Sequence, residues 1–193
     1  MPLVIRKATT DDGPFLVDII DMASDGLIPT LWAEMAPANM TGYDVGPAFV
    51  TAEDGDFSYR NGFIAELGEA ELGGLIGYVL PTTPKPIGPD VPAAFVCIEE
   101  LAQLVPGHWY INIMATVPEG RRQGVGTALL NEAEHQARAG ACSGLALIVV
   151  ASNEAAVSVY RRTGYVERAR RPFDLSNFGE EPNEAVLMVK ALA

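Results

Sequence analysis

Polar and apolar residues follow regular patterns along the first half of the chain. Residues 3–8 alternate weakly and predict an opening strand. The stretch 9–12 contains two threonines and then two aspartates, which favour a helix start. Apolar residues then recur at helical spacing over 15–23. Residues 27–40 form a second, poorer helical pattern that contains two prolines.

A hairpin and a proline-rich stretch come next. Residues 61–67 and 72–80 have strand patterns and are joined across the turn residues 68–70. Five prolines lie between positions 81 and 92, which favours an ordered surface excursion over a flexible linker. Residues 93–104 predict a short helix.

The second half begins with well-marked elements. We expect a strand over 108–117 and a helix over 127–139 that ends at a left-handed Gly140. Residues 145–151 are apolar without alternation, which is typical of a strand buried on both faces. The helix places four apolar residues on one side: Leu129, Leu130, Ala133 and Ala137.

One more helix and two strands close the chain. Asn153 can cap a helix that Gly164 stops, and 165–170 and 184–192 have strand patterns. The elements together predict an α/β (mixed α+β) fold, in which helices flank both faces of a central mixed sheet. A length of 193 residues suits a single domain over residues 1–193.

Composition narrows the classes of function. The chain has 13 Lys and Arg against 25 Asp and Glu, and its net charge of −12 disfavours nucleic acid or a membrane as partner. No apolar run reaches the roughly 20 residues of a membrane span, and the start lacks a secretion signal, so we expect a cytoplasmic protein. Cys97, Cys142, His108 and His135 are too few and too scattered for a disulfide scaffold or a metal site.

The charge is distributed unevenly. Residues 121–171 contain eight arginines and four glutamates, a local net charge of +4 that leaves −16 for the rest. A basic span in an acidic chain suggests a site for a polyanion, although most of these arginines are expected on solvated helix faces. The asymmetry gains weight only if the span contains a phosphate-binding element.

One such element lies between the strand 108–117 and the helix that follows it. Its sequence is Arg121-Arg122-Gln123-Gly124-Val125-Gly126-Thr127. Backbone N–H groups at a helix start lack intrahelical partners, and glycines let a phosphate approach them closely. The Lys-Ser/Thr of a Walker loop is missing, and Leu129 stands where the dinucleotide fingerprint has a third small residue.

Two signatures resemble the GCN5-related N-acetyltransferase (GNAT) family. Its pyrophosphate signature, Gln/Arg-x-x-Gly-x-Gly/Ala, is matched by Arg121-x-x-Gly124-x-Gly126. Its second signature, Asn-x-x-Ala…Tyr-x-x-x-Gly-Phe/Tyr, is matched between Asn153 and Tyr165. Together they cover roughly residues 108–166.

The resemblance implies acetyl-CoA as acyl donor and no metal. Backbone groups at the strand end would bind the pantetheine arm, the glycine loop would bind the pyrophosphate, and Asn153 would bind the cofactor arm. The implied cofactor-binding residues are Met114, Ala115, Thr116, Arg121, Arg122, Gln123, Gly124, Val125, Gly126, Thr127 and Asn153.

Tyr160 is the implied catalytic residue. It lies seven residues after Asn153, so both side chains share one helix face, and its phenol could protonate the departing CoA sulfur. The alternatives are a core aromatic beside Val157 for Tyr160, and a simple helix cap for Asn153, which is compatible with cofactor binding.

A general base is harder to identify. Relatives carry a glutamate at the position of Tyr110 or of Ile148, and neither residue is acidic here. His108, Tyr110 and Asn112 share a strand face that could order a water, and the acidic pair 99–100 is an alternative.

The acceptor side implied by the resemblance includes Trp32, Tyr43 and Tyr78. Trp32 and Tyr43 could box a cation or could equally be core residues. The acidic balance favours a cationic acceptor, namely a small amine, a polyamine or a peptide amino terminus. Relatives often pair through late strands, so residues 184–192 could support a homodimer.

These observations predict an acetyl-CoA-dependent N-acetyltransferase that acts on a primary amine of a small molecule or peptide. We expect direct transfer in a ternary complex, because neither Cys97 nor Cys142 has a neighbouring histidine in sequence. One alternative is a non-catalytic acyl-CoA-binding module with a sensor or regulatory role. Another is an α/β protein that binds a different phosphate ligand.

Overall fold

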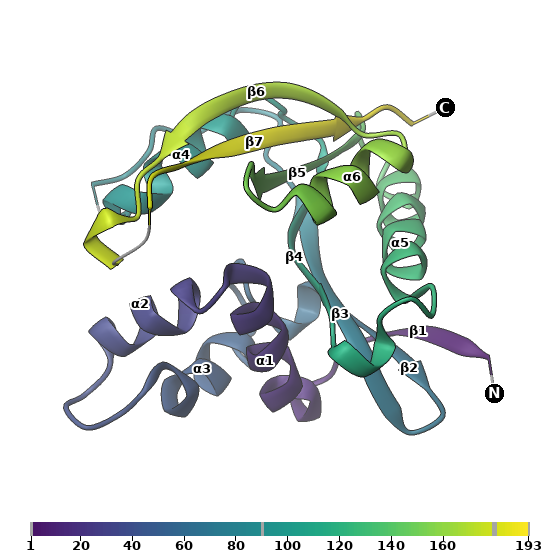
Figure 1. Ribbon diagram of the computed structural model, residues 1–193, viewed down its shortest axis with the longest axis horizontal. Helices are drawn as coiled ribbons and strands as arrows, with labels where there is room; N and C mark the ends of the chain where they lie inside the picture. The colour runs from purple at the N-terminus through teal and green to yellow at the C-terminus, as the bar shows by residue number, and fades with distance from the viewer. Residues whose placement is uncertain (1, 90, 179–180, 193) are drawn as a thin grey trace. The chain divides into compact units, whose positions relative to one another are not determined.

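The computed structural model describes residues 2–89, 91–178 and 181–192 (Figure 1). Its chain divides into two compact units. The first unit contains the residues up to Tyr78 and Ile111–Ala133, and the second contains Val79–Tyr110 and the residues from Glu134 onward. The elements are β1 (Leu3–Lys7), α1 (Gly13–Ser24), α2 (Leu27–Met35), α3 (Gly42–Val50), β2 (Gly62–Leu67), β3 (Ala70–Val79), α4 (Ala93–Ala102), β4 (Trp109–Thr116), α5 (Val125–Ala139), β5 (Leu145–Val150), α6 (Glu154–Arg162), β6 (Val166–Phe173) and β7 (Asn183–Lys190).

Within the described residues, seven strands hydrogen bond in the order β1-β2-β3-β4-β5-β7-β6. In the first unit, β1 and β3 both run antiparallel to β2, and the β2–β3 register shifts between Ala65 and Glu66. In the second unit, β5 and β6 both run antiparallel to β7. The predicted α/β fold class is therefore confirmed. The single-domain organisation stays a prediction.

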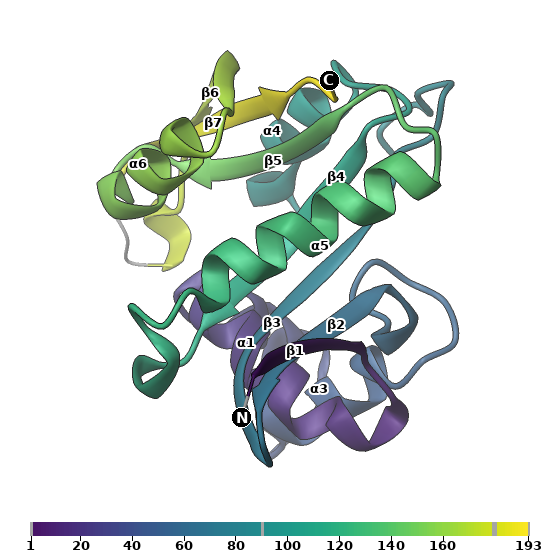
Figure 2. The same ribbon diagram turned by 90° about the vertical axis from the view of Figure 1, so that its right-hand side faces the viewer.

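Two adjacent glycines of β3 show that helices cover both faces of the sheet in the first unit. A Cβ on Gly73 would lie 2.8 Å from Val125 of α5, and a Cβ on Gly74 would lie 3.0 Å from Ile19 of α1. Successive strand residues point to opposite faces, so α1 and the start of α5 lie on opposite sides of β3 (Figure 2). A side chain at either glycine would push one of these helices away from the strand.

The helical pattern predicted over 27–40 is shorter in the structure, and a helix that was not predicted follows it. Helix α2 ends at Met35, and α3 begins after Thr41, whose backbone N–H donates to the Asp44 carboxylate at 2.7 Å in a capping box. A Cβ on Gly46 of α3 would lie 2.9 Å from the Trp32 ring. Glycine and proline weaken the helical signal of α3, yet glycine is what allows its close contact with α2.

The other predicted elements are confirmed with small shifts of their ends. The hairpin β2–β3, helix α4, strands β4 and β5, helix α6 and strands β6 and β7 all lie where the patterns place them. The four apolar residues of α5 are at most 5% exposed: Leu129, Leu130, Ala133 and Ala137. Within the described ranges, no helix has the length and apolar character needed to cross a membrane.

The predicted stop of α5 is wrong by one residue. The left-handed residue is Ala141, with φ of 48°, and Gly140 is not left-handed. The N–H of Cys142 donates to the Ala137 carbonyl at 2.9 Å, as in a Schellman motif with Ala141 in the usual glycine position. The helix end therefore carries backbone strain that the adjacent glycine does not relieve.

Candidate functional site

The glycine loop leads from β4 directly into the start of α5. The first intrahelical bond runs from the Ala128 N–H to the Gly124 carbonyl at 2.9 Å, so α5 begins two residues earlier than predicted. The N–H groups of residues 124–127 precede that bond and have no partner within the helix. Because α5 is 15 residues long, its dipole adds partial positive charge at this end. Arg121 and Arg122 are both exposed beside it.

The two glycines of this loop have different surroundings from the glycines that pack against protein. Gly124 has φ of 83°, and a Cβ added there would meet nothing within 4 Å. Gly126 has helical backbone, and its added Cβ would come no closer than 3.8 Å to another atom, the Thr116 hydroxyl oxygen. Neither the conformation nor the packing of the protein therefore requires glycine at 126. The space above the helix start is open to an anionic ligand.

The predicted pantetheine-binding residues lie at the end of β4 in the first unit. Met114, Ala115 and Thr116 are half-buried. The Val117 N–H donates to the Leu72 carbonyl of β3 at 3.1 Å, so β3 holds this strand end in place. The closeness of Thr116 to Gly126 shows that the strand end and the helix start adjoin. The structure thus brings together the predicted residues from 114 to 127.

Asn153 and Tyr160 belong to helix α6 in the second unit. The Asn153 side-chain oxygen accepts a hydrogen bond from the Ala156 N–H at 3.0 Å, so the predicted cap is confirmed. Tyr160 is 9% exposed, and burial raises its pKa to about 12. Its phenol is therefore fully protonated at neutral pH and can act as a hydrogen-bond donor.

Tyr165 lies beside Tyr160 with a ring-centroid distance of 5.7 Å in an edge-to-face arrangement. It is 2% exposed, and within the described part of the chain its buried hydroxyl has no hydrogen-bond partner. Burial raises the pKa of this phenol as well. The second unit therefore holds two adjacent tyrosines that both stay neutral.

The three predicted acceptor residues lie in different environments within the first unit. Trp32 is 3% exposed, stacks on Phe49 at 5.1 Å and meets the edge of Phe57, which favours the core alternative. Tyr43 is 50% exposed, and its hydrogen bond to Asp21 raises its pKa to about 12. Tyr78 is half-buried near the end of β3. Substrate binding by these residues stays a prediction.

The acidic charge of the protein is concentrated in the first unit. That unit has fifteen acidic residues against five basic ones, a net charge of −10, whereas the second unit has ten against eight, a net charge of −2. Residues 8–59, which contain α1, α2 and α3, include ten Asp or Glu and no Lys, Arg or His. A field of one sign over such a surface attracts cations and repels anions.

Sequence reasoning missed the segment 51–61 between α3 and β2. The buried Ser58 hydroxyl donates to the Ala52 carbonyl at 2.6 Å, and the Asn112 side chain on β4 donates to the Asp56 carbonyl at 3.2 Å. The segment has no helical or strand period, so its only sequence signal was a cluster of polar turn residues.

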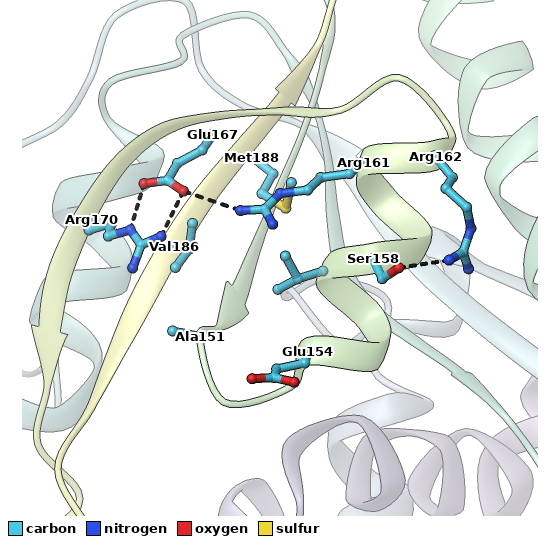
Figure 3. A pocket seen from close by; sticks show the side chains of 10 residues that line it. Ala151, Glu154, Ser158, Arg161, Arg162, Glu167, Arg170, Val186 and Met188 are labelled. Carbon is cyan, nitrogen blue, oxygen red and sulfur yellow. Dashed lines mark hydrogen bonds and ion pairs between the residues drawn. The ribbon is translucent and has the colours of Figure 1, made fainter.

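A pocket of about 440 Å³ lies between α6 and strands β6 and β7 in the second unit (Figure 3). Its charged groups mostly bind one another, because the Glu167 carboxylate accepts from Arg170 at 2.5 and 2.8 Å and lies 3.8 Å from Arg161. The Arg162 guanidinium donates to the Ser158 hydroxyl at 2.7 Å. These arginines therefore agree with the prediction that they belong to a solvated surface, and they do not indicate a second anion-binding site.

The remaining candidate groups are the cysteines and the residues considered as bases. Cys97 and Cys142 are free, and burial raises the pKa of both thiols. Glu100 is engaged by Arg171, whose Nε donates to it at 3.0 Å. The His108 Nδ1 lies 3.2 Å from the Pro106 carbonyl oxygen. In the described ranges, no three His, Cys, Asp or Glu side chains cluster in a way that could hold a metal.

Comparison with known proteins agrees with this geometry. The family model described as the acetyltransferase (GNAT) family matches residues 56–165. Aminoglycoside N(6′)-acetyltransferase type 1 from Klebsiella aerogenes is 40% identical over 62 residues, which are 32% of this chain. The match spans 38% of the length of that relative.

Two solved structures have a similar fold. An N-acetyltransferase from Staphylococcus aureus Mu50 has a TM-score of 0.68 at 18% identity, with 96% of this chain and 99% of that chain covered. The NatC complex bound to Gag peptide and CoA has a TM-score of 0.59 at 14% identity, with both chains fully covered at 100%. The family model covers more than half of the sequence. The chain belongs to the GNAT family of acetyltransferases.

Proposed function

We propose that this protein transfers an acetyl group from acetyl-CoA directly to a primary amine of a small molecule or peptide. The observation that carries the proposal concerns Gly126. Neither the backbone conformation at this position nor the packing of neighbouring atoms requires a glycine. A glycine within a helix costs about 1 kcal/mol relative to alanine. A ligand pyrophosphate that needs close access to the backbone accounts for its presence.

The residues present fit the donor along two adjoining segments of the first unit. The N–H groups at the start of α5, flanked by Arg121 and Arg122, would bind the pyrophosphate. Backbone groups of Met114, Ala115 and Thr116 would bind the pantetheine amides, and cofactor binding by Asn153 stays a prediction. Bound in this way, the donor supplies an activated acetyl thioester, and no step requires a metal.

The proposed acid is Tyr160. With a pKa of about 12, its phenol keeps its proton at neutral pH and can donate it to the thiolate that leaves as the C–S bond breaks. Transfer through a covalent acyl-cysteine would need a thiolate nucleophile. Burial disfavours ionisation of both Cys97 and Cys142, which supports direct transfer in a ternary complex.

The proposed acceptor is cationic. The ten acidic residues of 8–59, without a single basic one, favour an amine that carries several positive charges. The Klebsiella aerogenes relative is an aminoglycoside acetyltransferase, and an aminoglycoside is an acceptor of this kind. We also propose a cytoplasmic location, which agrees with the two free cysteines. A homodimer through β7 remains a prediction.

Calorimetry and thiol release test this proposal together. We expect acetyl-CoA to bind with a Kd in the micromolar range, and free thiol to appear when an aminoglycoside, spermidine or a peptide is added. For a cationic acceptor, KM should rise severalfold when ionic strength increases from about 0.05 to 0.5 M, because salt screens the acidic field. Binding without thiol release across the panel would favour the non-catalytic acyl-CoA-binding module. No binding would contradict both CoA-based functions.

A further inference from the structure

Asp56 is held beside β4 by contacts that do not involve its carboxylate. The Asn112 side chain of β4 donates to the Asp56 backbone carbonyl at 3.2 Å. On the other side of Asp56, the Asn61 side chain donates to the Gly55 carbonyl at 3.1 Å, and Ser58 is 1% exposed. These contacts fix the backbone of the segment, so the position of Asp56 relative to β4 is well defined within the first unit.

The Asp56 side chain is exposed to solvent, in the segment whose backbone Asn112 joins to β4. Solvent reaches the side chain, yet desolvation by the surrounding protein raises the pKa of its carboxyl group. In the described ranges, no hydrogen bond or ion pair involves this carboxylate. A solvent-accessible carboxylate without a partner in these ranges has its lone pairs available to an incoming group.

The charged neighbours of Asp56 are already occupied with one another. In its own segment, Arg60 pairs with Glu53, which also accepts from the Tyr59 hydroxyl at 3.2 Å. The neighbouring elements contribute Asn112 from β4, and Trp32 from α2 through its contact with Phe57. The side chains of Asn112, Trp32 and Phe57 are all uncharged at neutral pH. Lys7 of β1 also reaches this segment, where its ammonium group donates to the Arg60 carbonyl at 2.8 Å. In the described ranges, no cation therefore pairs with Asp56 in place of an incoming ammonium group.

Resting on the acetyl transfer proposed above, we propose that Asp56 is the general base, taking the proton from the ammonium group of the acceptor. The residues at the positions where relatives carry a glutamate, Tyr110 and Ile148, cannot take a proton at neutral pH. Asn112, which holds Asp56, lies only two residues before Met114, the first of the predicted pantetheine-binding residues. The base would thus stand next to the strand along which the thioester is expected to lie.

The proton balance is complete with the groups named. The ammonium nitrogen gives one proton to the Asp56 carboxylate, which releases it to water. The free amine then attacks the thioester carbon, so that the C–N bond forms as the C–S bond breaks. The sulfur takes a proton from Tyr160, and the second proton lost by the nitrogen returns to the phenolate through water. The products are an acetamide, CoA thiol and one released proton.

The test compares Asp56→Asn with Asp54→Asn in acetylation of spermidine and of an aminoglycoside. Asn at position 56 keeps the backbone carbonyl that Asn112 binds, and Asp54 is an exposed acid of the same segment, so the second variant removes the same charge nearby. We expect kcat/KM at pH 7 to fall about 100-fold or more for Asp56→Asn and less than about threefold for Asp54→Asn. Calorimetry should give both variants the acetyl-CoA affinity of the wild type.

The pH profile separates a base from a residue that only binds or supports the fold. The deficit of Asp56→Asn should shrink toward pH 10, where the acceptor amine loses its proton to solvent. In NMR, the Asp56 carboxyl should titrate above the ordinary aspartate pKa. A deficit that is the same at every pH, a kcat/KM equal to wild type or an ordinary pKa would overturn the assignment. A wild-type protein that releases no thiol would overturn the acetyl transfer instead.

Discussion

Each compact unit contains a pair of identical residues with different surroundings. In the first unit, the space of a Cβ on Gly42 is occupied by Pro29, whereas the space above Gly126 is open. In the second unit, the Tyr165 hydroxyl is enclosed and has no hydrogen-bond partner among the described residues, whereas Tyr160 is 9% exposed. One member of each pair is therefore enclosed by the protein, whereas the other keeps some access to solvent. Residue type alone does not distinguish the members, but the neighbouring atoms do.

The two units also differ in how they could recognise a ligand. The first unit offers backbone N–H groups at a helix start and an acidic field with a net charge of −10. The second, near neutral at −2, offers the protonated phenol of Tyr160, which is more exposed than that of Tyr165. Backbone N–H groups and an electrostatic field select a whole class of molecules by charge, whereas one proton donor serves one step of a reaction.

Gly42→Ala should cause the largest loss of stability. In an isolated helix this change would stabilise by about 1 kcal/mol, but here the new methyl group would overlap with the Pro29 carbonyl oxygen. We expect a loss of about 3 kcal/mol, and a thermal midpoint lower by roughly 6–12 °C. Gly88→Ala is the matched control, because a Cβ there meets nothing within 4 Å. An unchanged midpoint for Gly42→Ala would contradict the tight α2–α3 contact.

Gly126→Glu should remove ligand binding and leave the fold intact. The carboxylate would occupy the open space, and its charge would repel a pyrophosphate, so calorimetry should show acetyl-CoA affinity reduced at least 100-fold. An acid in the first turn of a helix interacts favourably with the dipole, so the thermal midpoint should stay equal or rise slightly. Gly88→Glu adds the same charge at another open glycine and should bind acetyl-CoA normally. Normal binding by Gly126→Glu would place the pyrophosphate elsewhere.

Tyr160→Phe should lower kcat by about 100-fold or less and leave acetyl-CoA affinity unchanged. The phenylalanine keeps the ring that packs against Tyr165 and loses only the proton donor. Because the pKa of Tyr160 is raised to about 12, the donor form persists through pH 10. Ionisation of this group should therefore cause no fall in wild-type rate between pH 7 and 10, measured by thiol release. A Tyr160→Phe enzyme with full kcat would leave the tyrosine as a packing residue.

The sequence predicted the elements whose signals are local. Asn153 caps α6 through an N–H only three residues away, and Gly164 ends that helix with φ of 93°, so both signals act within a few residues. The glycine loop was predictable for the same reason, since Gly124 has a left-handed φ of 83° and Gly126 follows it only two residues later. Their roles in binding stay predictions, because they depend on a ligand.

The features that were not predicted depend on contacts between distant residues. Helix α3 needs Gly46 against Trp32, fourteen positions earlier in the chain, and no local pattern reveals that contact. Asp56 is placed by Asn112, which is 56 positions away. The Thr41–Asp44 capping box was the one local signal that could have indicated α3.

Tyr165→Phe should have the smallest effect, with a sign opposite to that of most core substitutions. It removes a buried hydroxyl that has no partner within the described ranges, so the fold should gain about 1 kcal/mol, and the thermal midpoint should rise by roughly 2–4 °C.

The alkaline pH dependence of stability tests the same point a second time. Burial raises the folded-state pKa of Tyr165, so above pH 10 the unfolded chain loses this proton while the folded protein keeps it, and wild-type stability falls. The Phe variant lacks this term, so its advantage should be constant below pH 9 and widen above pH 10, as measured by urea unfolding at each pH. A variant less stable than wild type at pH 7 would show that the hydroxyl has a partner in solution, and Tyr165 would then join Tyr160 as a candidate for ligand contact.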